Sequence, residues 1–595
     1  MFQTFDAPTS PDQGPPRLSA LRDQIAAEGL DGFLVPRADA HQGEYVADRD
    51  QRLAWLTGFT GSAGFAAVLA DVAGVFVDGR YTLQVRDQVA DVFTPVSWPA
   101  TKLGDWLAAQ LPDGGRVGFD PWLHTRAEID AAAKAAPNID LVPTDNLVDR
   151  IWPDQPAPPD GKAIPYPIEF AGEKSSDKRK RIAAILKKDG QRAAVLTLPD
   201  SICWLLNIRG SDVTRTPLIH AFAIQHDDGR VALFADPEKF SDLGPDPSVA
   251  VSPTSDFAPA LARLTGPVRV DRNTAPVAVC DALKTAGIEV TWADDPCALP
   301  KARKNETELA GTRDAHLHDG AAMVEFLAWL DREAPEGGLT EIDVVTALEG
   351  FRSGTNELRD ISFDTIAGAG PNGAIVHYRV THDTNRPVKP GELLLVDSGG
   401  QYLDGTTDIT RTVAIGTPRA DHIACFTRVL RGMIAISRLR FPRGLAGRDL
   451  DAVARAPLWT AGQDYDHGTG HGVGTFLSVH EGPQRLARTG EVPFEPGMIL
   501  SNEPGYYRTG DFGIRIENLI IVQNAPPMDG ADDRDMLGFE TLTFAPIDCR
   551  LIDPALMTGE EVAWLNAYHG EVRDKIAPRV SAEALEWLDQ ATRPV

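Results

Sequence analysis

Residues 391–416 read GELLLVDSGGQYLDGTTDITRTVAIG, and this stretch predicts two β-strands joined by a glycine-rich turn. In a hairpin centred between Tyr402 and Leu403, Asp397 lies opposite Asp408, and both side chains point to the same face. Asp397 ends the apolar run LLLV, so we expect it to be buried. A buried carboxylate without a partner takes up a proton in preference to staying charged. A cation bound between the two acids would keep both ionised.

A second pair of acids lies in residues 501–522, SNEPGYYRTGDFGIRIENLIIV. Glu503 and Glu517 are symmetric about a turn at Gly510, so a second hairpin would make them a cross-strand pair. Glu517 alternates with Arg515 and with apolar residues, which predicts that its side chain points inward. The first pair alone also fits a solvated hairpin tip carrying two ordinary acids. Two such pairs favour a metal site.

Residues 466–483, DHGTGHGVGTFLSVHEGP, lie between these hairpins and carry three histidines. His467 and His471 have the spacing of two metal ligands on one face of a helix. Each glycine inside a helix costs about 1 kcal/mol relative to alanine, and this stretch is rich in glycine. We therefore predict a turn or a tight strand, in which one histidine is a metal ligand and the others serve the chemistry.

The charges of these groups indicate how many ions the site holds. Four carboxylates balance two divalent cations, and such pairs lie about 3.5–4 Å apart, bridged by carboxylates and by a water whose pKa falls towards neutrality. Four oxygen donors, one imidazole and no thiolate suit manganese, with cobalt or zinc as alternatives. The sequence therefore predicts a two-metal hydrolytic site.

The chain of 595 residues is long enough for three or four domains. Residues 153–167, PDQPAPPDGKAIPYP, hold six prolines in fifteen positions and predict a linker. A helical stretch followed by an apolar strand occurs on both sides of it, which suggests two related α/β domains. Four aligned pairs support this weak repeat: Trp55 with Trp204, Leu56 with Leu205, Gly61 with Gly210, and Ser62 with Ser211.

A third unit begins near PKARKNETELAG, where Asn305 and Glu308 have the spacing of a helix capping box. An apolar helical face follows, from Leu309 to Ala328. These boundaries predict a mixed α/β (α+β) chain of three domains: 1–160, 161–302 and 303–595.

Bulk composition restricts the partners. A net charge of −27 disfavours nucleic acid, because its binding relies on basic residues that neutralise phosphates. The chain has neither an apolar run of membrane-spanning length nor the features of a signal peptide, so we expect a cytoplasmic protein without a membrane partner. The five cysteines are scattered and never spaced as C-x-x-C, which fits reduced thiols.

Five motifs in fixed order resemble the catalytic domain of aminopeptidase P, the Xaa-Pro aminopeptidases among the pita-bread metallopeptidases. They are VDSGGQYLDGTTDITRT, HGTGHGVG, SVHEGP, NEPGYY and GIRIEN. The resemblance extends over nearly the whole chain and matches the long, three-domain cytosolic form. It implies two creatinase-like N-terminal α/β domains followed by a pita-bread catalytic domain, and a homodimer.

The resemblance also implies roles for individual residues. It assigns two divalent metal ions to a set of five ligands: Asp397, Asp408, His471, Glu503 and Glu517. Asp408 and Glu517 would bridge the ions, and Glu503 would also act as the base that orients a bridging hydroxide. All five ligands are present in the chain.

Three further histidines match the family's additional active-site histidines: His377 in AIVHYR, His467 and His480. Amide cleavage needs donors to the developing oxyanion and a proton for the leaving nitrogen. We expect His480 and His377 to act as donors to the scissile carbonyl and the intermediate, and His467 to line the proline pocket or to buttress a ligand. Tyr507 and Arg515 are further candidates for contact with the substrate.

The activity implied is removal of the first residue from peptides with proline in the second position, by a hydroxide that bridges the metals. One alternative is a prolidase that acts on Xaa-Pro dipeptides, although prolidases usually lack the duplicated N-terminal half. Another is a non-catalytic pita-bread binding protein, which the complete ligand set opposes, as it opposes metal-free creatinase chemistry. Residues 368–373, GAGPNG, also match a dinucleotide-binding pattern, but we expect a strand over AIVHYRV where that pattern requires a helix.

Overall fold

The computed structural model describes residues 1–595. The chain divides into two compact units, one of residues Pro8–Lys301 and the other of Met1–Ala7 with Ala302–Val595. None of its helices combines the length with the apolar character needed to cross a membrane. The finer division into three domains remains a proposal: 1–160, 161–302 and 303–595.

The first half of the unit Pro8–Lys301 is built on a six-stranded sheet with the order β4-β3-β2-β1-β5-β6. Strands β1, β2 and β3 pair antiparallel, whereas β4, β5 and β6 each join in parallel. The strands are β1 (Gly32–Pro36), β2 (Phe65–Leu69), β3 (Ala73–Val77), β4 (Thr94–Ser97), β5 (Gly115–Phe119) and β6 (Ile139–Pro143).

Alternating residues of β1 place apolar side chains on both faces of this sheet. Phe33 and Val35 pack in one cluster with α1 (Gly14–Ala27), α2 (Arg52–Thr57) and α6 (Leu147–Ile151). Leu34 packs in the opposite cluster with α4 (Leu103–Gln110) and α5 (Arg126–Ala135). Burial on both faces explains why β1 is apolar throughout.

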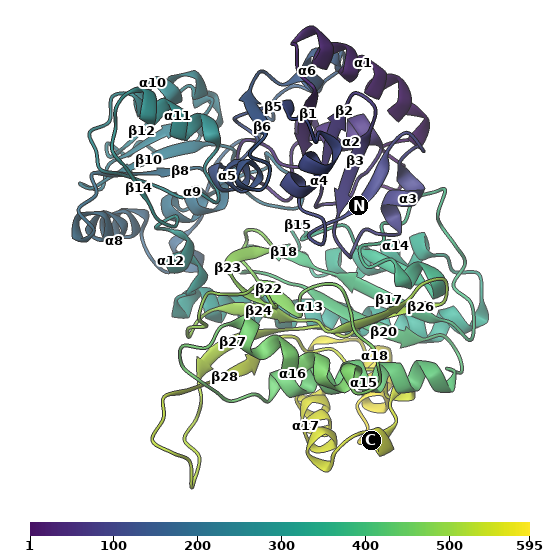
Figure 1. Cartoon of the computed structure of the whole chain (residues 1–595). Helices are drawn as coiled ribbons and strands as arrows, with labels where there is room; N and C mark the ends of the chain where they lie inside the picture. Colours follow the sequence, from purple (N-terminus) through teal and green to yellow (C-terminus); the bar gives the residue numbers. More distant parts are fainter. The chain divides into compact units, whose positions relative to one another are not determined.

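A second six-stranded sheet repeats this topology, with the order β12-β11-β10-β8-β13-β14. Its pairings follow the same sequence of antiparallel and parallel neighbours. Figure 1 places α10 and α11 on one face and α8 and α9 on the other. The strands are β8 (Ala193–Leu196), β10 (Phe222–His226), β11 (Val231–Phe234), β12 (Val249–Ser252), β13 (Val268–Val270) and β14 (Val290–Trp292). The helices are α8 (Ser175–Lys188), α9 (Pro199–Leu206), α10 (Phe257–Leu261) and α11 (Val277–Thr285).

The weak sequence repeat thus corresponds to a repeated fold. Trp55 in α2 and Trp204 in α9 both lie in the helix that follows the first strand of their sheet. Residues 153–163 of the predicted linker form no helix or strand, and β7 (Ile164–Pro165) then pairs with β9 (Ile208–Arg209) of the second half. The prediction of two related α/β domains is confirmed.

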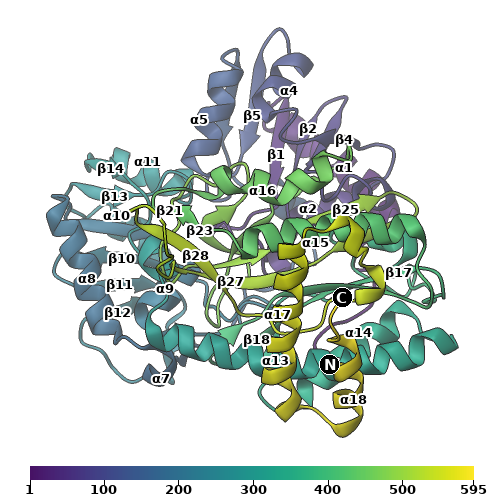
Figure 2. The same ribbon diagram turned by 90° about the horizontal axis from the view of Figure 1, so that it is seen from below.

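The unit that contains the candidate site combines six long helices with several sheets. Asn305 caps the first helix, and both halves of the predicted capping box with Glu308 form. In Figure 2, α17 and α18 lie beside α13, in agreement with their direct contacts. The helices are α13 (Glu306–Glu333), α14 (Glu341–Ser353), α15 (Ala420–Ser437), α16 (Gly447–Trp459), α17 (Gly559–Ile576) and α18 (Ala582–Ala591).

The sheets of this unit are small except for one of six strands, ordered β21-β28-β27-β24-β22-β23. Two three-stranded sheets have the orders β16-β17-β20 and β15-β18-β19, and β25 and β26 form a hairpin. The strands are β15 (Asp360–Ile361), β16 (Ile366–Ala369), β17 (Leu393–Ser398), β18 (Gly400–Tyr402), β19 (Gly405–Thr406), β20 (Ile409–Ala414), β21 (Phe441–Pro442), β22 (Gly470–Gly472), β23 (Glu481–Leu486), β24 (Ile499–Asn502), β25 (Gly505–Arg508), β26 (Phe512–Arg515), β27 (Asn518–Asn524) and β28 (Met536–Thr541).

The first predicted hairpin forms, but its register differs from the prediction. Tyr402 pairs with Gly405, so the turn is centred one residue later than expected. Asp397 consequently lies opposite Thr410, and not opposite Asp408. The difference is two residues along one strand, so the two acids still share a face, because side chains alternate with a period of two.

A buried ion pair ties this hairpin to the long helices. Arg352 of α14 donates to Asp319 of α13 through Nε at 2.7 Å and Nη2 at 3.1 Å. The Tyr402 hydroxyl donates to the same carboxylate at 2.7 Å. The Arg352 side chain is fully buried and that of Asp319 is 5% exposed. The tip of the hairpin is therefore fixed by charge-assisted hydrogen bonds.

Replacing Arg352 by leucine should destabilise this unit by about 3–5 kcal/mol, because Asp319 would remain as a buried charge without its partner. Urea unfolding followed by tryptophan fluorescence would measure the loss. The matched control is Arg573→Leu, which breaks an ion pair with Asp589 whose side chains are 58% and 50% exposed. The control should cost less than about 1 kcal/mol. Equal effects of the two variants would contradict the prediction.

Candidate metal centre

The five predicted ligands converge from strand ends and turns. Asp397 lies near the end of β17, His471 lies in the middle of β22, and Asp408 directly precedes β20. Glu503 follows β24 and Glu517 precedes β27. Their ligand atoms form overlapping groups, each with its members within 4.8 Å of one another: Asp397, Asp408 and Glu517; His471, Glu503 and Glu517; and Asp408, His471 and His480.

The second hairpin has the predicted register. Asn502 pairs with Asn518 and Gly505 with Arg515, on either side of the two glutamates. Glu503 and Glu517 are therefore cross-strand partners between two ladders. The side chain of Glu517 is buried, as its alternation with apolar residues predicts.

His471 faces two of the acids through one ring nitrogen. Its Nε2 lies 3.4 Å from Asp408 Oδ2 and 3.5 Å from Glu503 Oε1. Its Nδ1–H donates to the carbonyl of Gly472 at 2.9 Å, which fixes the ring orientation. This is the arrangement in which a histidine offers Nε2 to a metal and holds its other nitrogen on a second group.

Two carboxylate oxygens in this cluster are buried without a hydrogen-bond partner, Asp397 Oδ1 and Glu517 Oε1. A buried anionic oxygen left in this way is costly. The second oxygen of each acid is held: Arg515 Nη2 donates to Asp397 Oδ2 at 2.5 Å, and Thr410 Oγ1 donates to Glu517 Oε2 at 2.7 Å. The unpartnered oxygens and the hard donor set fit divalent cations.

The pKa values of two of these acids, Glu503 and Glu517, are raised in the protein without metal ions. Burial, followed by the charge of Asp408, raises the pKa of Glu517 well above its usual range. Burial raises the pKa of Glu503 to about 7, although His471 and Arg515 oppose the shift. Burial lowers the pKa of His471, but the carboxylates of Asp408 and Glu503 outweigh it and raise the pKa to about 9. Cations bound among the acids would reverse the shifts of the carboxyl groups.

A chain of hydrogen bonds links Asp397 to His467. Arg515 donates to Asp397 and, through Nη1, to the hydroxyl of Tyr507 at 2.6 Å. Tyr507 in turn lies 2.8 Å from His467 Nε2, and the Nδ1 of that ring is 2.7 Å from the carbonyl of Gly468. Tyr507 therefore accepts from Arg515 and donates to His467. Arg515 is almost fully buried, so it holds the ligand in place from within the protein.

The other two predicted histidines, His480 and His377, lie in separate segments of the chain. The ring of His480 packs edge-on against His471, with centroids 4.3 Å apart, and belongs to one of the ligand groups. His377 lies in a turn after the short 3₁₀ helix Gly370–Ala374, and the strand expected over AIVHYRV is wrong. Tyr378 closes this turn by donating to Glu341 at 2.8 Å. The turn adjoins the site, because the carbonyl of Val376 accepts from Arg515 at 3.3 Å.

Sequence reasoning missed several supporting residues. Asp451 and Arg455 lie four residues apart on α16 and form hydrogen bonds with the glycine-rich segment. Arg455 donates to the carbonyl of His467 at 2.7 Å, and Asp451 accepts from Thr469 Oγ1 at 2.7 Å. The only sequence signal was an acid and an arginine at helical spacing, a pattern that also occurs on exposed helices.

Arg411 connects the site to the C-terminal helices. Its buried guanidinium donates to the carbonyl of Glu517 at 2.6 Å and to that of Ala545 at 2.8 Å. It also lies 2.9 Å from the hydroxyl of Tyr568 on α17. The segment that carries Glu517 is therefore fixed from the far end of the chain.

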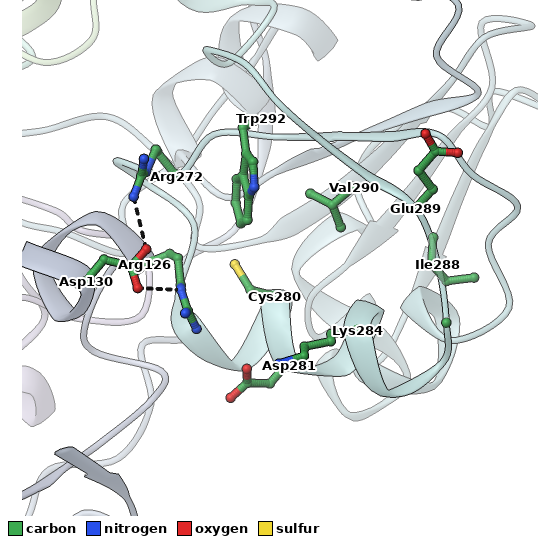
Figure 3. Close-up of a pocket in the computed structure, with 11 residues that line it drawn as sticks. Arg126, Asp130, Arg272, Cys280, Asp281, Lys284, Ile288, Glu289, Val290 and Trp292 are labelled. Atoms are coloured by element: carbon green, nitrogen blue, oxygen red, sulfur yellow. Dashed lines mark hydrogen bonds and ion pairs between the residues drawn. The ribbon is translucent and has the colours of Figure 1, made fainter. Parts of the chain in front are cut away.

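A separate pocket of about 620 Å³ lies in the unit Pro8–Lys301 (Figure 3). Asp130 in its wall pairs with Arg126 at 2.9 Å and with Arg272 at 3.0 Å. Trp292 of β14 and Cys280 of α11 also face this pocket. It includes none of the predicted site residues, and its basic and acidic groups are mixed.

The fold and the site define a metallopeptidase. The model of "Metallopeptidase family M24" matches residues 310–524. The model of the "C-terminal region of peptidase_M24" matches residues 535–595. Two family models, both described as "Creatinase/Prolidase N-terminal domain", match residues 17–151 and residues 154–308. The repeated topology of the two N-terminal sheets agrees with this double match.

Full-length relatives identify the particular group. Aminopeptidase P1 of Lotus japonicus is 38% identical, and aminopeptidase P1 of Arabidopsis thaliana is 37% identical; each match covers 97% of this chain and 99% of the relative. A solved X-prolyl aminopeptidase from Caenorhabditis elegans, described as a cytosolic enzyme with a dinuclear active site, is 32% identical with a TM-score of 0.92. That match covers 98% of this chain and 99% of the other. The chain belongs to the aminopeptidase P family.

The predicted family, the fold class and the enzyme class of metal-dependent aminopeptidase are therefore confirmed. Two divalent ions as cofactors are supported by the family and by the donor set. The roles of single residues remain proposals.

Metal ions should stabilise the protein more strongly at higher pH. The pKa of Glu503 is raised from 4.5 to about 7 in the folded, metal-free protein. In the pH window between these two values, the folded protein therefore holds a proton that the unfolded chain has lost. Its stability therefore falls as the pH rises through the window. His471, raised from 6.5 to about 9, adds the same trend at higher pH. Because cations replace these protons, the rise in Tm on adding Mn²⁺ to chelated protein should be larger at pH 8 than at pH 6.

Differential scanning fluorimetry at the two pH values would measure these shifts. A rise in Tm that is equal at both pH values, or larger at pH 6, would contradict the prediction.

Proposed function

We propose that this chain removes the N-terminal residue from peptides whose second residue is proline. The observation that carries the proposal is the convergence of four acids and His471 in one buried cluster, within a chain that aligns with aminopeptidases P over 97% of its length. Two divalent ions, when bound, supply Lewis-acid polarisation of the scissile carbonyl and activation of water. Asp397, Asp408, His471, Glu503 and Glu517 would hold them.

The acids also favour an exopeptidase. The free amino group of the substrate must reach the metal centre that these acids would hold, and this requirement places the first peptide bond at the site. Ser501 Oγ donates to Glu503 Oε1 at 3.2 Å, which orients this carboxylate. We assign to it the uptake of a proton from water and the return of a proton to the leaving nitrogen.

The histidines would serve the carbonyl and the proline. A proline nitrogen carries no hydrogen, so the protein must orient the bond through its carbonyl and through the shape of the ring pocket. We assign His480 and His377 as donors to the carbonyl oxygen and to the intermediate. His467, held by Tyr507, would line the proline pocket, and Arg515 would keep Asp397 and Tyr507 in register.

The finer properties in the proposal follow from the same sequence features. Manganese fits the oxygen-rich donor set, with cobalt or zinc as alternatives. A homodimer and a cytoplasmic location are proposed from the resemblance to the long, three-domain cytosolic form of the family.

Chelation should abolish hydrolysis of a tripeptide with proline in second position, and Mn²⁺ should restore it. The expected loss reaches the background rate, because the carboxylates lack the Lewis acid that the reaction requires. Release of the first amino acid, measured by chromatography, provides the readout. A rate unchanged by chelation would contradict the metal-dependent mechanism.

Comparison of an Xaa-Pro dipeptide with an Xaa-Pro-Xaa tripeptide separates the proposal from a prolidase. We expect the higher kcat/KM for the tripeptide. Exclusive hydrolysis of the dipeptide would identify a prolidase instead.

Replacing His480 by alanine should lower kcat by about 10²–10³-fold, the usual effect of losing one donor to an oxyanion. Metal content, measured by mass spectrometry of the purified enzyme, should not change. The control is His318→Ala, because His318 is an exposed histidine on α13. Loss of metal from the His480 variant would assign this residue to metal binding and not to the carbonyl.

A further inference from the structure

A buried ion pair is formed by Lys304 and Glu481, the residue that follows His480 in the chain. Lys304 Nζ is 2.5 Å from Glu481 Oε1, and the two side chains are 2% and 0% exposed. Removing one member of such a pair leaves an uncompensated charge inside the protein. Neither residue has a role in the proposed reaction.

Glu481 is joined directly to the candidate metal centre. It follows His480 in the chain, and its backbone pairs with Gly472 of β22. The carbonyl of Gly472 is the group that accepts the Nδ1–H of His471. Glu481 is therefore linked to His480 through the chain and to His471 through the sheet.

Lys304 is equally well fixed. Its backbone N–H donates to the carbonyl of Gly497 at 3.0 Å, and the next residue, Asn305, caps α13. Gly497 has a φ of +87°, and a Cβ there would lie 2.7 Å from the Lys304 carbonyl oxygen, so this close approach requires glycine. The ammonium group thus extends from a rigid support.

The loop before His480 is clamped at other points as well. The N–H of Gly474 donates to Ser478 at 2.9 Å, and Gln401 Nε2 donates to the carbonyl of Leu477 at 2.8 Å. Phe476 is buried with a φ of +48°, a conformation that persists only where the surroundings enforce it. Lys304 supplies the corresponding restraint on the other side of His480.

We infer that Lys304 is a positioning residue for His480. Its ammonium fixes the carboxylate of Glu481, and Glu481 in turn fixes the orientation of the imidazole beside Asp408 and His471. The inference rests on the carbonyl-binding role proposed for His480. Small misplacements of such a group cost rate and not affinity, because the reaction requires alignment in the transition state.

The test replaces both charges at once, Lys304→Met with Glu481→Met, so that neither is left unpaired in the interior. We expect kcat for the tripeptide to fall by about 10–100-fold, with KM and metal content unchanged. Lys304→Arg, which keeps the ion pair, should retain most of the activity. The matched control is Arg303→Met, which removes an exposed pair with Glu495 and should leave kcat unchanged.

A double-mutant cycle with His480→Ala separates positioning from general support. If Lys304 acts through His480, the two methionines cause no further loss of kcat in the His480→Ala background. Full kcat in the double-methionine enzyme, or the same fold-loss in both backgrounds, overturns the inference alone. A His480→Ala enzyme with full kcat overturns the proposed role of His480 and this inference together.

If the double-methionine chain does not fold, Glu481→Gln provides the same test. This variant keeps the shape and a hydrogen bond but removes the charge. A fall in kcat that disappears in the His480→Ala background supports the inference, and an unchanged kcat overturns it.

Discussion

Repulsion among buried carboxylates is the constraint around which the second unit of the chain is built. Burial and mutual charge raise the pKa of Asp397, Glu503 and Glu517, so the cluster is costly unless cations enter it. The protein holds the acids together through rigid strand ends and through donors such as Arg515 and Thr410. These donors occupy one oxygen of Asp397 and of Glu517 and leave the other buried without a hydrogen-bond partner. The same geometry that destabilises the acids selects for divalent ions.

Much of this site could be predicted from the sequence, because hairpins convert spacing into position. The symmetry of Glu503 and Glu517 about Gly510 correctly predicted their pairing. The register of Asp397 was wrong by two residues, since the sequence did not indicate which of several glycines begins the turn. The face was nevertheless correct, because an even shift preserves it.

Long-range support was not predictable in the same way. Arg455 and Lys304 reach the site from segments without a motif, and their contacts depend on how separate elements pack. The turn around His377 was mistaken for a strand, because burial alternates there as it does in a strand: Ala374, Val376, Tyr378 and Val380 are buried and the residues between them are partly exposed. The duplicated N-terminal halves left only a faint signal in sequence, although their sheets have one topology. A core position accepts many different apolar residues, so the two sequences can differ while the strand order stays the same.

The contact of Arg411 with Tyr568 has a consequence for biosynthesis. The carbonyl of Glu517 and the hydroxyl of Tyr568 share one guanidinium, so the innermost ligand segment is completed by a helix that ends at Ile576. A ribosome releases that helix only after all five ligand residues have been translated. A nascent chain therefore contains every metal ligand before it contains the helix that supports the Glu517 segment through Arg411.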